Sequence, residues 1–150
     1  MAACPELETL MPYLGEGLIT AENEAFLRRR CGEKADWAYG ELKWLLTYAQ
    51  REGIDPFELR GSMYGAIGLC QFMPSSLSAF GVDADGDGRI DPFSKADAFH
   101  SIANYLRGHG WQSGLDREGQ HRVIFAYNRS VVYANTVLAI AERIRQGASH

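Results

Sequence analysis

The sequence predicts an all-α fold. Three segments, 38–49, 94–106 and 131–146, repeat apolar residues at the spacing of one helix face. Almost nothing alternates polar and apolar residues as a half-buried strand does. With 150 residues, of which 46% are hydrophobic and 23% charged, the chain suits a single globular domain over residues 1–150.

The first half of the chain predicts two helices. Prolines and glycines between residues 5 and 17 disfavour a long helix there, and Thr20 is placed to cap a short helix that ends near Gly32. The next helix has apolar residues at i, i+4, i+7, i+8 and i+11, namely Ala38, Leu42, Leu45, Leu46 and Ala49. Trp37, Trp44 and Tyr48 widen this face, and Gly53 is placed to end the helix. We therefore expect this helix at the centre of the core.

The segment GSMYGAIGLCQFMPSS, residues 61–76, has neither a helical nor a strand period. Its glycines at 61, 65 and 68 indicate close backbone approach or positive φ angles. Polar and aromatic residues are interleaved, which suits the wall of a cleft that binds a sugar. A tightly packed structural turn is an equal alternative.

The second half predicts three more helices and at most a short strand pairing near Ile90. Ser94 is placed to cap a helix whose buried stripe is Phe99, Ile102, Ala103 and Leu106. A helix over 120–127 is followed by one over 131–146, after Ser130. The last helix is expected to bury Tyr133, Val137, Ile140, Ala141 and Ile144.

An acidic loop lies before the helix that Ser94 caps. Asp83, Asp85 and Asp87 occupy positions one, three and five of a calcium-loop pattern, with Gly88 at position six and the carbonyl of Arg89 at seven. Position twelve is Ser94 instead of the usual Glu, so Asp97 is the nearest carboxylate that closes the shell. The alternative is a solvated acidic turn, which Asp and Gly also favour. The spacing favours calcium.

Composition excludes several classes of protein. The net charge is −4 and the basic residues are dispersed, which argues against a nucleic-acid partner. We find no segment that could span a membrane and no signal peptide at the start. Cys4, Cys31 and Cys70 are an odd number at wide spacing, and they predict neither a disulfide framework nor a cysteine metal site.

Four motifs occur in order along the chain: GSMYGAIGLCQFMPSS, GVDADGDGRID, ADAFHSIANYLRGHGW and AYNRSVVYANTVLAIAERI. Together they resemble the membrane-bound lytic transglycosylase B group of murein-cleaving enzymes, most clearly over residues 34–144. The resemblance implies a lysozyme-like α-domain that cleaves peptidoglycan glycan strands between N-acetylmuramic acid and N-acetylglucosamine. The C6 hydroxyl of the muramoyl residue would attack in place of water and leave a 1,6-anhydro end.

The same resemblance implies the residues of two sites. Ser62 and Gln71 would line the saccharide cleft, and Tyr127, Asn128 and Tyr133 would face it. The calcium shell would be Asp83, Asp85, Asp87, the Arg89 carbonyl and Asp97. For each cleft residue the alternative is a packing role. The resemblance also implies a monomer in the periplasm or cell envelope.

The chemistry needs a carboxylic acid of raised pKa to protonate the glycosidic oxygen. In the family this Glu lies upstream of the Gly-Ser motif at a helix end. Glu8, followed by Thr9, is the candidate here, although Leu10, Met11 and Pro12 follow it instead of an aromatic residue and Gly. The alternative is that Met1 is internal to a longer reading frame and that the catalytic helix is missing, which the absence of an export signal favours. Glu41 is expected to be solvated or ion-paired.

Two functions from different classes therefore stay open. One is a lytic transglycosylase. The other is a non-catalytic peptidoglycan-binding fragment that lacks the general acid. A calcium sensor is disfavoured because the chain has only one such loop.

Overall fold

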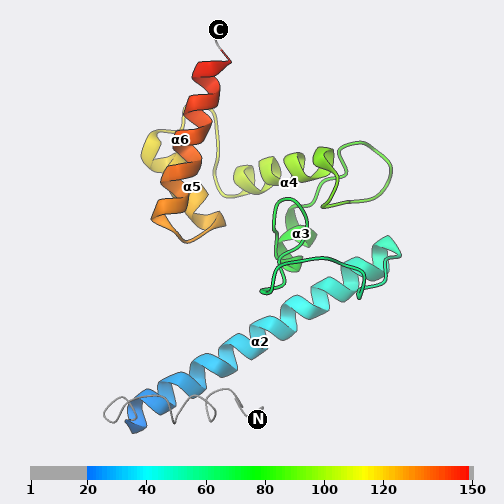
Figure 1. Ribbon diagram of the computed structural model, residues 1–150, viewed down its shortest axis with the longest axis vertical. Helices are drawn as coiled ribbons and strands as arrows, with labels where there is room; N and C mark the ends of the chain where they lie inside the picture. The colour runs from blue at the N-terminus through cyan, green and yellow to red at the C-terminus, as the bar shows by residue number, and fades with distance from the viewer. Residues whose placement is uncertain (1–19, 149–150) are drawn as a thin grey trace. The chain divides into compact units, whose positions relative to one another are not determined.

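The computed structural model describes residues 20–148, and over that range the chain folds into five helices (Figure 1). They are α2 (Ala21–Glu52), α3 (Pro74–Phe80), α4 (Lys95–Gly108), α5 (Arg117–Tyr127) and α6 (Val131–Gly147). The described residues contain no strand, and two isolated bridges pair Gly61 with Ile67 and Ile67 with Phe72. The all-α prediction is confirmed. The expected strand pairing near Ile90 is wrong, because the bridges instead lie within the glycine-rich segment 61–72, which folds back on itself.

The chain divides between Leu59 and Arg60 into two compact units. Where it is described, the first unit consists of α2 and the turn that follows it, and the second contains the other four helices. The expectation of one lysozyme-like domain over residues 1–150 stays a prediction. None of the helices within residues 20–148 is long and apolar enough to cross a bilayer.

Helix α2 begins and ends where the sequence predicts. The Thr20 hydroxyl accepts the N–H of Asn23 at 3.1 Å, and Gly53 ends the helix with a φ of 67°. The expected break at Gly32 is wrong. One glycine costs a helix only about 1 kcal/mol, and ion pairs one turn apart flank it, such as Arg28 with Glu24 at 2.8 Å.

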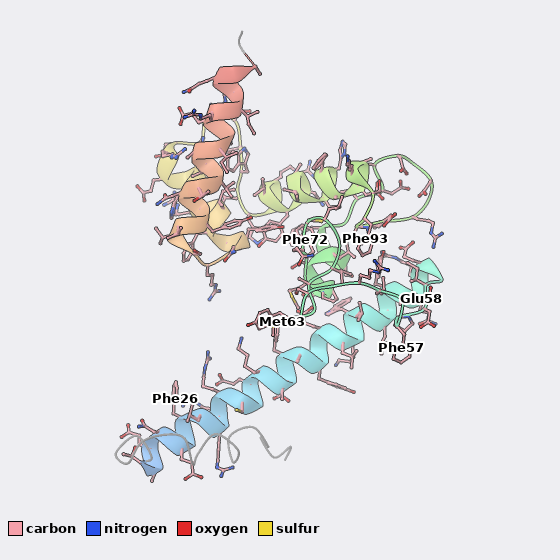
Figure 2. All side chains as sticks on the ribbon, viewed as in Figure 1. Phe26, Phe57, Glu58, Met63, Phe72 and Phe93 are labelled. Atoms are coloured by element: carbon pink, nitrogen blue, oxygen red, sulfur yellow. The ribbon has the colours of Figure 1, made fainter. Side chains whose placement is uncertain are left out.

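The apolar face of α2 is not a core face. Trp37, Leu42, Trp44 and Leu46 are 45%, 48%, 46% and 47% exposed. Only Tyr48 and Ala49, in the last turns of this helix, are buried. The expectation of a central core helix is therefore wrong for most of its length, because periodicity identifies an apolar face but not what covers it. Phe26 also projects outward from this helix (Figure 2).

The second unit packs its helices in pairs. Helix α3 contacts α4, and α5 contacts α6, so each pair consists of helices that are consecutive in the chain (Figure 1). Helix α3 was not predicted; Pro74 occupies its first turn, a position where proline is favoured. Helix α5 begins at Arg117, earlier than expected, because the Asp116 carboxylate accepts the N–H of Gly119 at 2.8 Å and caps it.

Two predicted buried stripes are only partly correct. Leu106 and Val137 pack, partly buried, against the core cluster of Ile124, Ala134 and Leu138, but most of the other predicted residues are exposed. Helix α4 buries Asp97, Ala98, Ser101 and Tyr105, whereas Phe99 is 65% exposed. Helix α6 buries Ala134 and Leu138, whereas Ile140 and Ile144 are 55% and 67% exposed. In α4 the apolar pattern failed because polar residues are buried through hydrogen bonds; the Ser101 hydroxyl accepts the N–H of Val82 at 3.0 Å.

Candidate functional site

The acidic loop brings three carboxylates together. Oxygens of Asp83, Asp85 and Asp97 all lie within 4.8 Å of one another. Asp97 lies in the first turn of α4 and is 1% exposed, whereas Asp85 is exposed. Three carboxylates at this spacing repel one another, and oxygen ligands of this kind suit a hard cation. The donor set therefore fits calcium.

Backbone N–H groups hold the buried carboxylate in place. The two Asp97 oxygens accept the N–H groups of Ala84 at 2.9 Å and Asp91 at 2.8 Å. Each carboxylate oxygen has two lone pairs, so each one can accept an N–H and still face a cation. Asp97 thus ties the start of the loop to its end. Its role as the ligand that closes the calcium shell in place of Ser94 stays a prediction.

The other two predicted ligands have different surroundings. The Asp87 carboxylate accepts the N–H of Arg89 at 2.8 Å, and the described group of three carboxylates does not include it. Gly86 and Gly88 have φ angles of 78° and 87°, which let the chain fold back over Asp83. The roles of Asp87 and of the Arg89 carbonyl as ligands stay predictions.

The glycine segment 61–72 carries an unusual backbone angle at Gln71. Among the described residues, Gln71 alone has a positive φ without being glycine, at 49°. Its backbone and side-chain N–H groups both donate to the Gly68 carbonyl, at 3.1 and 2.8 Å. Residue 71 as a whole is exposed, although its side-chain hydrogen bond to Gly68 is partly buried. Strain of this kind persists only where the surrounding structure imposes it, and it is common at functional sites.

Ser62 has a local role in the same segment. Its hydroxyl accepts the N–H groups of Tyr64 at 3.3 Å and Ala66 at 3.1 Å, and its own N–H donates to the Ala66 carbonyl at 2.8 Å. Ser62 therefore shapes the turn from which Met63 projects, 90% exposed (Figure 2). Its predicted contact with a saccharide stays a prediction.

An aromatic cluster joins this segment to α3, α4, α5 and α6. It contains six rings, those of Phe72, Phe80, Tyr105, His109, Tyr127 and Tyr133. The Tyr127 ring lies 5.9 Å from Phe72, 5.3 Å from Tyr105 and 6.3 Å from Tyr133, to which it is nearly parallel. The structure thus brings Tyr127 and Tyr133 together beside the residue that follows Gln71.

Hydrogen bonds fix the two inner tyrosines. The Tyr127 hydroxyl donates to the carbonyl of Cys70, which precedes Gln71, and the Tyr105 hydroxyl donates to the Ala126 carbonyl at 3.1 Å. Burial raises the pKa of Tyr127 far above its usual range, and the neighbouring Tyr133, Cys70 and Tyr105 raise it further. Burial also raises the pKa of Tyr105 and of the Cys70 thiol. These groups are neutral near pH 7, and the tyrosines act as hydrogen-bond donors there.

Two predicted site residues, Asn128 and Glu8, remain to be placed. Asn128 follows Tyr127 as the exposed C-cap of α5. Glu8 lies outside the described residues. The sequence did not single out Tyr105, His109 or Phe80 as part of the site, although Tyr105 and His109 stack with ring centroids 3.9 Å apart. Their separation by four residues on one helix was the available signal.

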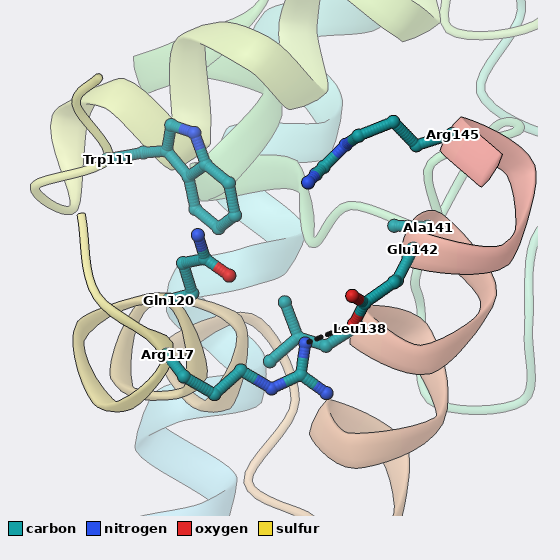
Figure 3. Close-up of a pocket in the computed structure, with 7 residues that line it drawn as sticks. All are labelled: Trp111, Arg117, Gln120, Leu138, Ala141, Glu142 and Arg145. Carbon is teal, nitrogen blue, oxygen red and sulfur yellow. Dashed lines mark ion pairs between the residues drawn. The ribbon is translucent and has the colours of Figure 1, made fainter. Parts of the chain in front are cut away.

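A pocket of about 500 Å³ lies elsewhere, between α5, α6 and the loop before α5 (Figure 3). Its lining residues are Trp111, Arg117, Gln120, Leu138, Ala141, Glu142 and Arg145. Arg117 and Glu142 lie 3.9 Å apart, and both side chains are more than half exposed. None of the five predicted saccharide-binding residues lines this pocket. The predicted saccharide-binding residues therefore lie outside this pocket.

Comparison with known proteins gives consistent relatives. Residues 18–120 match the family described as "Transglycosylase SLT domain". Over 81 residues the chain is 46% identical to membrane-bound lytic murein transglycosylase B of Escherichia coli K12, covering 54% of this chain and 22% of that protein.

Two solved structures are also similar. The soluble lytic transglycosylase SltB1 of Pseudomonas aeruginosa has a TM-score of 0.72 at 29% identity, over 79% of this chain and 60% of that one. The Escherichia coli lytic transglycosylase Slt35 in complex with calcium has a TM-score of 0.55 at 44% identity, over 57% of this chain and 27% of that one. These similarities confirm the lysozyme-like fold. The chain spans 22% of the length of the curated relative and 60% of the length of SltB1.

Proposed function

The chain belongs to the transglycosylase SLT domain family, and on this basis we propose that it acts on the glycan strands of peptidoglycan as a lytic transglycosylase. The reaction breaks the β-1,4 bond between N-acetylmuramic acid and N-acetylglucosamine without water. The general acid gives its proton to the glycosidic oxygen, which leaves. The muramoyl C6 hydroxyl attacks C1 of its own ring, and the resulting carboxylate takes the hydroxyl proton, which restores the acid. The product is a 1,6-anhydro-muramoyl end, and no second protein carboxylate is needed as nucleophile.

The observation that supports this site best is Gln71 in its left-handed conformation beside the aromatic cluster. Gln71, whose amide donates to the Gly68 carbonyl, follows Cys70, whose carbonyl accepts the Tyr127 hydroxyl. A pyranose ring presents C–H faces that pack on aromatic side chains, and N-acetyl groups that bond to amides. We infer that Gln71, Asn128 and Ser62 orient the sugar, and that Tyr127 and Tyr133 form the wall against which it packs.

The cation belongs to the scaffold of this site and not to the chemical step. Calcium bound by Asp83, Asp85 and Asp97, with Asp87 and the Arg89 carbonyl completing the shell, would cancel the repulsion among the carboxylates. The calcium complex of Slt35, which is 44% identical over the matched region, supports this assignment. A rise in melting temperature with millimolar calcium, absent in Asp83→Ala, is the expected result.

The proton donor is the part of the proposal that rests on the sequence alone. A general acid must be held in an apolar, partly desolvated site so that it stays protonated at neutral pH. Glu8 is the candidate for this role. The proposal also includes a monomeric protein that acts in the cell envelope, since the curated relative is described as membrane-bound.

Purified murein sacculi provide the test. Incubation with the chain should release 1,6-anhydro-muropeptides, which mass spectrometry identifies by the loss of one water relative to hydrolysed ends. Glu8→Gln should abolish this product, and Glu22→Gln, an exposed carboxylate in the first turn of α2, should leave it unchanged. Ends that carry the extra water would contradict the transglycosylase mechanism. If the Glu8→Gln variant still forms the anhydro product, another carboxylate is the general acid.

A further inference from the structure

We propose that Pro92 positions Gln71, so that cation binding in the acidic loop strengthens glycan binding at the segment 61–72. This inference rests on the proposed function for the identity of the sugar. The residues that link the two sites, Pro92 and Gly68, belong to neither the metal site nor the cleft, and an unbroken series of contacts passes through them.

The first contact in the series links Asp97 to the residue before Pro92. The Asp97 carboxylate accepts the N–H of Asp91 at 2.8 Å while it faces Asp83 and Asp85. Phe93, on the other side of Pro92, donates its N–H to the Asp91 carboxylate at 2.8 Å. The backbone around Pro92 is therefore fixed by the same side chain that the cation would contact.

The second contact links Pro92 to the glycine segment. Pro92 is among the most deeply buried side chains, with less than 2% exposed, and its carbonyl accepts the N–H of Leu69 at 2.8 Å. Gly68 lies so close that a Cβ there would collide with the Cβ and the carbonyl oxygen of Pro92. Two backbones in direct contact leave no flexible side chain between them to absorb a shift.

The third contact links Gly68 to Gln71. The Gly68 carbonyl accepts both the backbone and the side-chain N–H of Gln71. The Ile67 N–H donates to the Phe72 carbonyl at 2.8 Å, and the Phe72 N–H donates to the Ile67 carbonyl at 3.1 Å. These two hydrogen bonds close the turn around Gln71. A non-glycine residue in the left-handed region is unfavourable by itself. The position of Gly68 against Pro92 therefore helps to hold Gln71 in this conformation.

The consequence is a free-energy coupling between two ligands. A cation that draws Asp83, Asp85 and Asp97 together fixes the Asp91–Phe93 turn, which fixes Gly68 and then Gln71. Binding a sugar to a Gln71 that is already ordered loses less conformational entropy. By reciprocity, the sugar must strengthen cation binding by the same factor, which is at least about 5-fold for a coupling of typical size.

Chitotetraose and calcium, titrated into the full chain, provide the test. The dissociation constant of chitotetraose, followed by NMR of the Gln71 amides, should be at least about 5-fold lower in millimolar calcium than in chelator. In Gly68→Ala this ratio should approach one, while the rise in melting temperature with calcium persists. Gly114→Ala is the matched control, because Gly68 and Gly114 have φ angles of 74° and 79° but a Cβ at Gly114 meets nothing within 4 Å. Pro92→Ala should also lower the ratio without preventing calcium binding.

The sugar is not needed for a second measurement. Calcium alone should shift the Gln71 backbone resonance and slow its amide hydrogen exchange, and Gly68→Ala should remove both effects. A Gln71 amide that does not respond to bound calcium would overturn the coupling, even if chitotetraose binds. A calcium response at Gln71 without any chitotetraose binding would support the coupling and contradict the proposed glycan site. An equal ratio in the parent chain, Gly68→Ala and Gly114→Ala would also overturn the role of Gly68 and Pro92.

Discussion

The acidic loop and the aromatic cluster are held together by different forces. In the loop, carboxylates accept backbone N–H groups from residues at most 13 positions away, such as Ala84 with Asp97. In the cluster, rings from separate elements pack together, and the Tyr127 hydroxyl reaches a carbonyl 57 positions away. The loop thus depends on charge and on nearby backbone, whereas the cluster depends on burial and on distant packing. Changes of charge should damage the first, and loss of shape or of buried polar contacts should damage the second.

The largest effect is expected at Asp97, where both forces meet because the carboxylate is charged and buried. Asp97→Ala leaves the N–H groups of Ala84 and Asp91 without their acceptor. Each such loss costs about 1–3 kcal/mol, so the free energy of unfolding in chelator should fall by about 3 kcal/mol. Urea denaturation measures this change. Asp87→Ala, at an exposed position, should change it by no more than about 0.5 kcal/mol. Equal losses for the two variants would remove the distinction between them.

Tyr127→Phe separates the polar contact of the cluster from its packing. The ring remains, but the Cys70 carbonyl loses its donor, which should lower the free energy of unfolding by about 1–2 kcal/mol. Tyr64→Phe removes a hydroxyl from a side chain that is 75% exposed and serves as the control, with a change below about 0.5 kcal/mol. A Tyr127→Phe protein as stable as the parent would mean that this hydrogen bond contributes nothing net.

Alkaline pH should affect the cluster and leave the loop unaffected. Burial raises the pKa of Tyr127 in the folded chain, while in the unfolded chain it stays near 10. Above about pH 10 the unfolded state therefore binds fewer protons than the folded state, and the free energy of unfolding falls as pH rises. Thermal melting between pH 8 and about 11 should show this fall, and Tyr127→Phe should reduce it. A profile identical in the two proteins would contradict the assignment.

The smallest effect is expected at Gln71, and it has an unusual sign. Gln71→Gly and Gln71→Ala both remove the amide, but only glycine adopts a positive φ without strain. The Gly variant should therefore be more stable than the Ala variant by about 1 kcal/mol. At Gln112, an exposed loop residue outside the left-handed region, the order should reverse, with Gly below Ala. The same order at both positions would argue against strain at Gln71.

The two regions also differ in how far the sequence could predict them. The carboxylate spacing of the loop and the caps at Thr20 and Gly53 were predictable because their partners lie a few residues away. The contact between Tyr127 and Cys70 was not, since no local pattern reports a partner 57 residues distant. The buried stripe of α4 was misplaced for a related reason. Asp97 and Ser101 are buried because N–H groups from the preceding loop satisfy them, and hydrophobic periodicity does not detect such residues.

The proposed cleft residues were assigned by resemblance to a family, and the residues themselves offered only the interleaved polar and aromatic pattern of 61–76, which fits a packed turn equally well. Gln71 gained independent support only from its φ angle, which a sequence does not reveal. For Ser62 the structure supports the alternative of a structural role, because its hydroxyl accepts two backbone N–H groups within its own turn.

Mapping where a glycan binds tests whether Gln71 and Tyr127 form the glycan site. Chitotetraose, added stepwise to the isotopically labelled chain in millimolar calcium, should give its largest NMR shift changes at Gln71, Tyr127, Asn128 and Tyr133. Gln71→Ala should weaken the binding, and Gln112→Ala should leave it unchanged. Shift changes confined to the pocket lined by Trp111 and Arg145, or to α2, would contradict a glycan site at Gln71 and Tyr127.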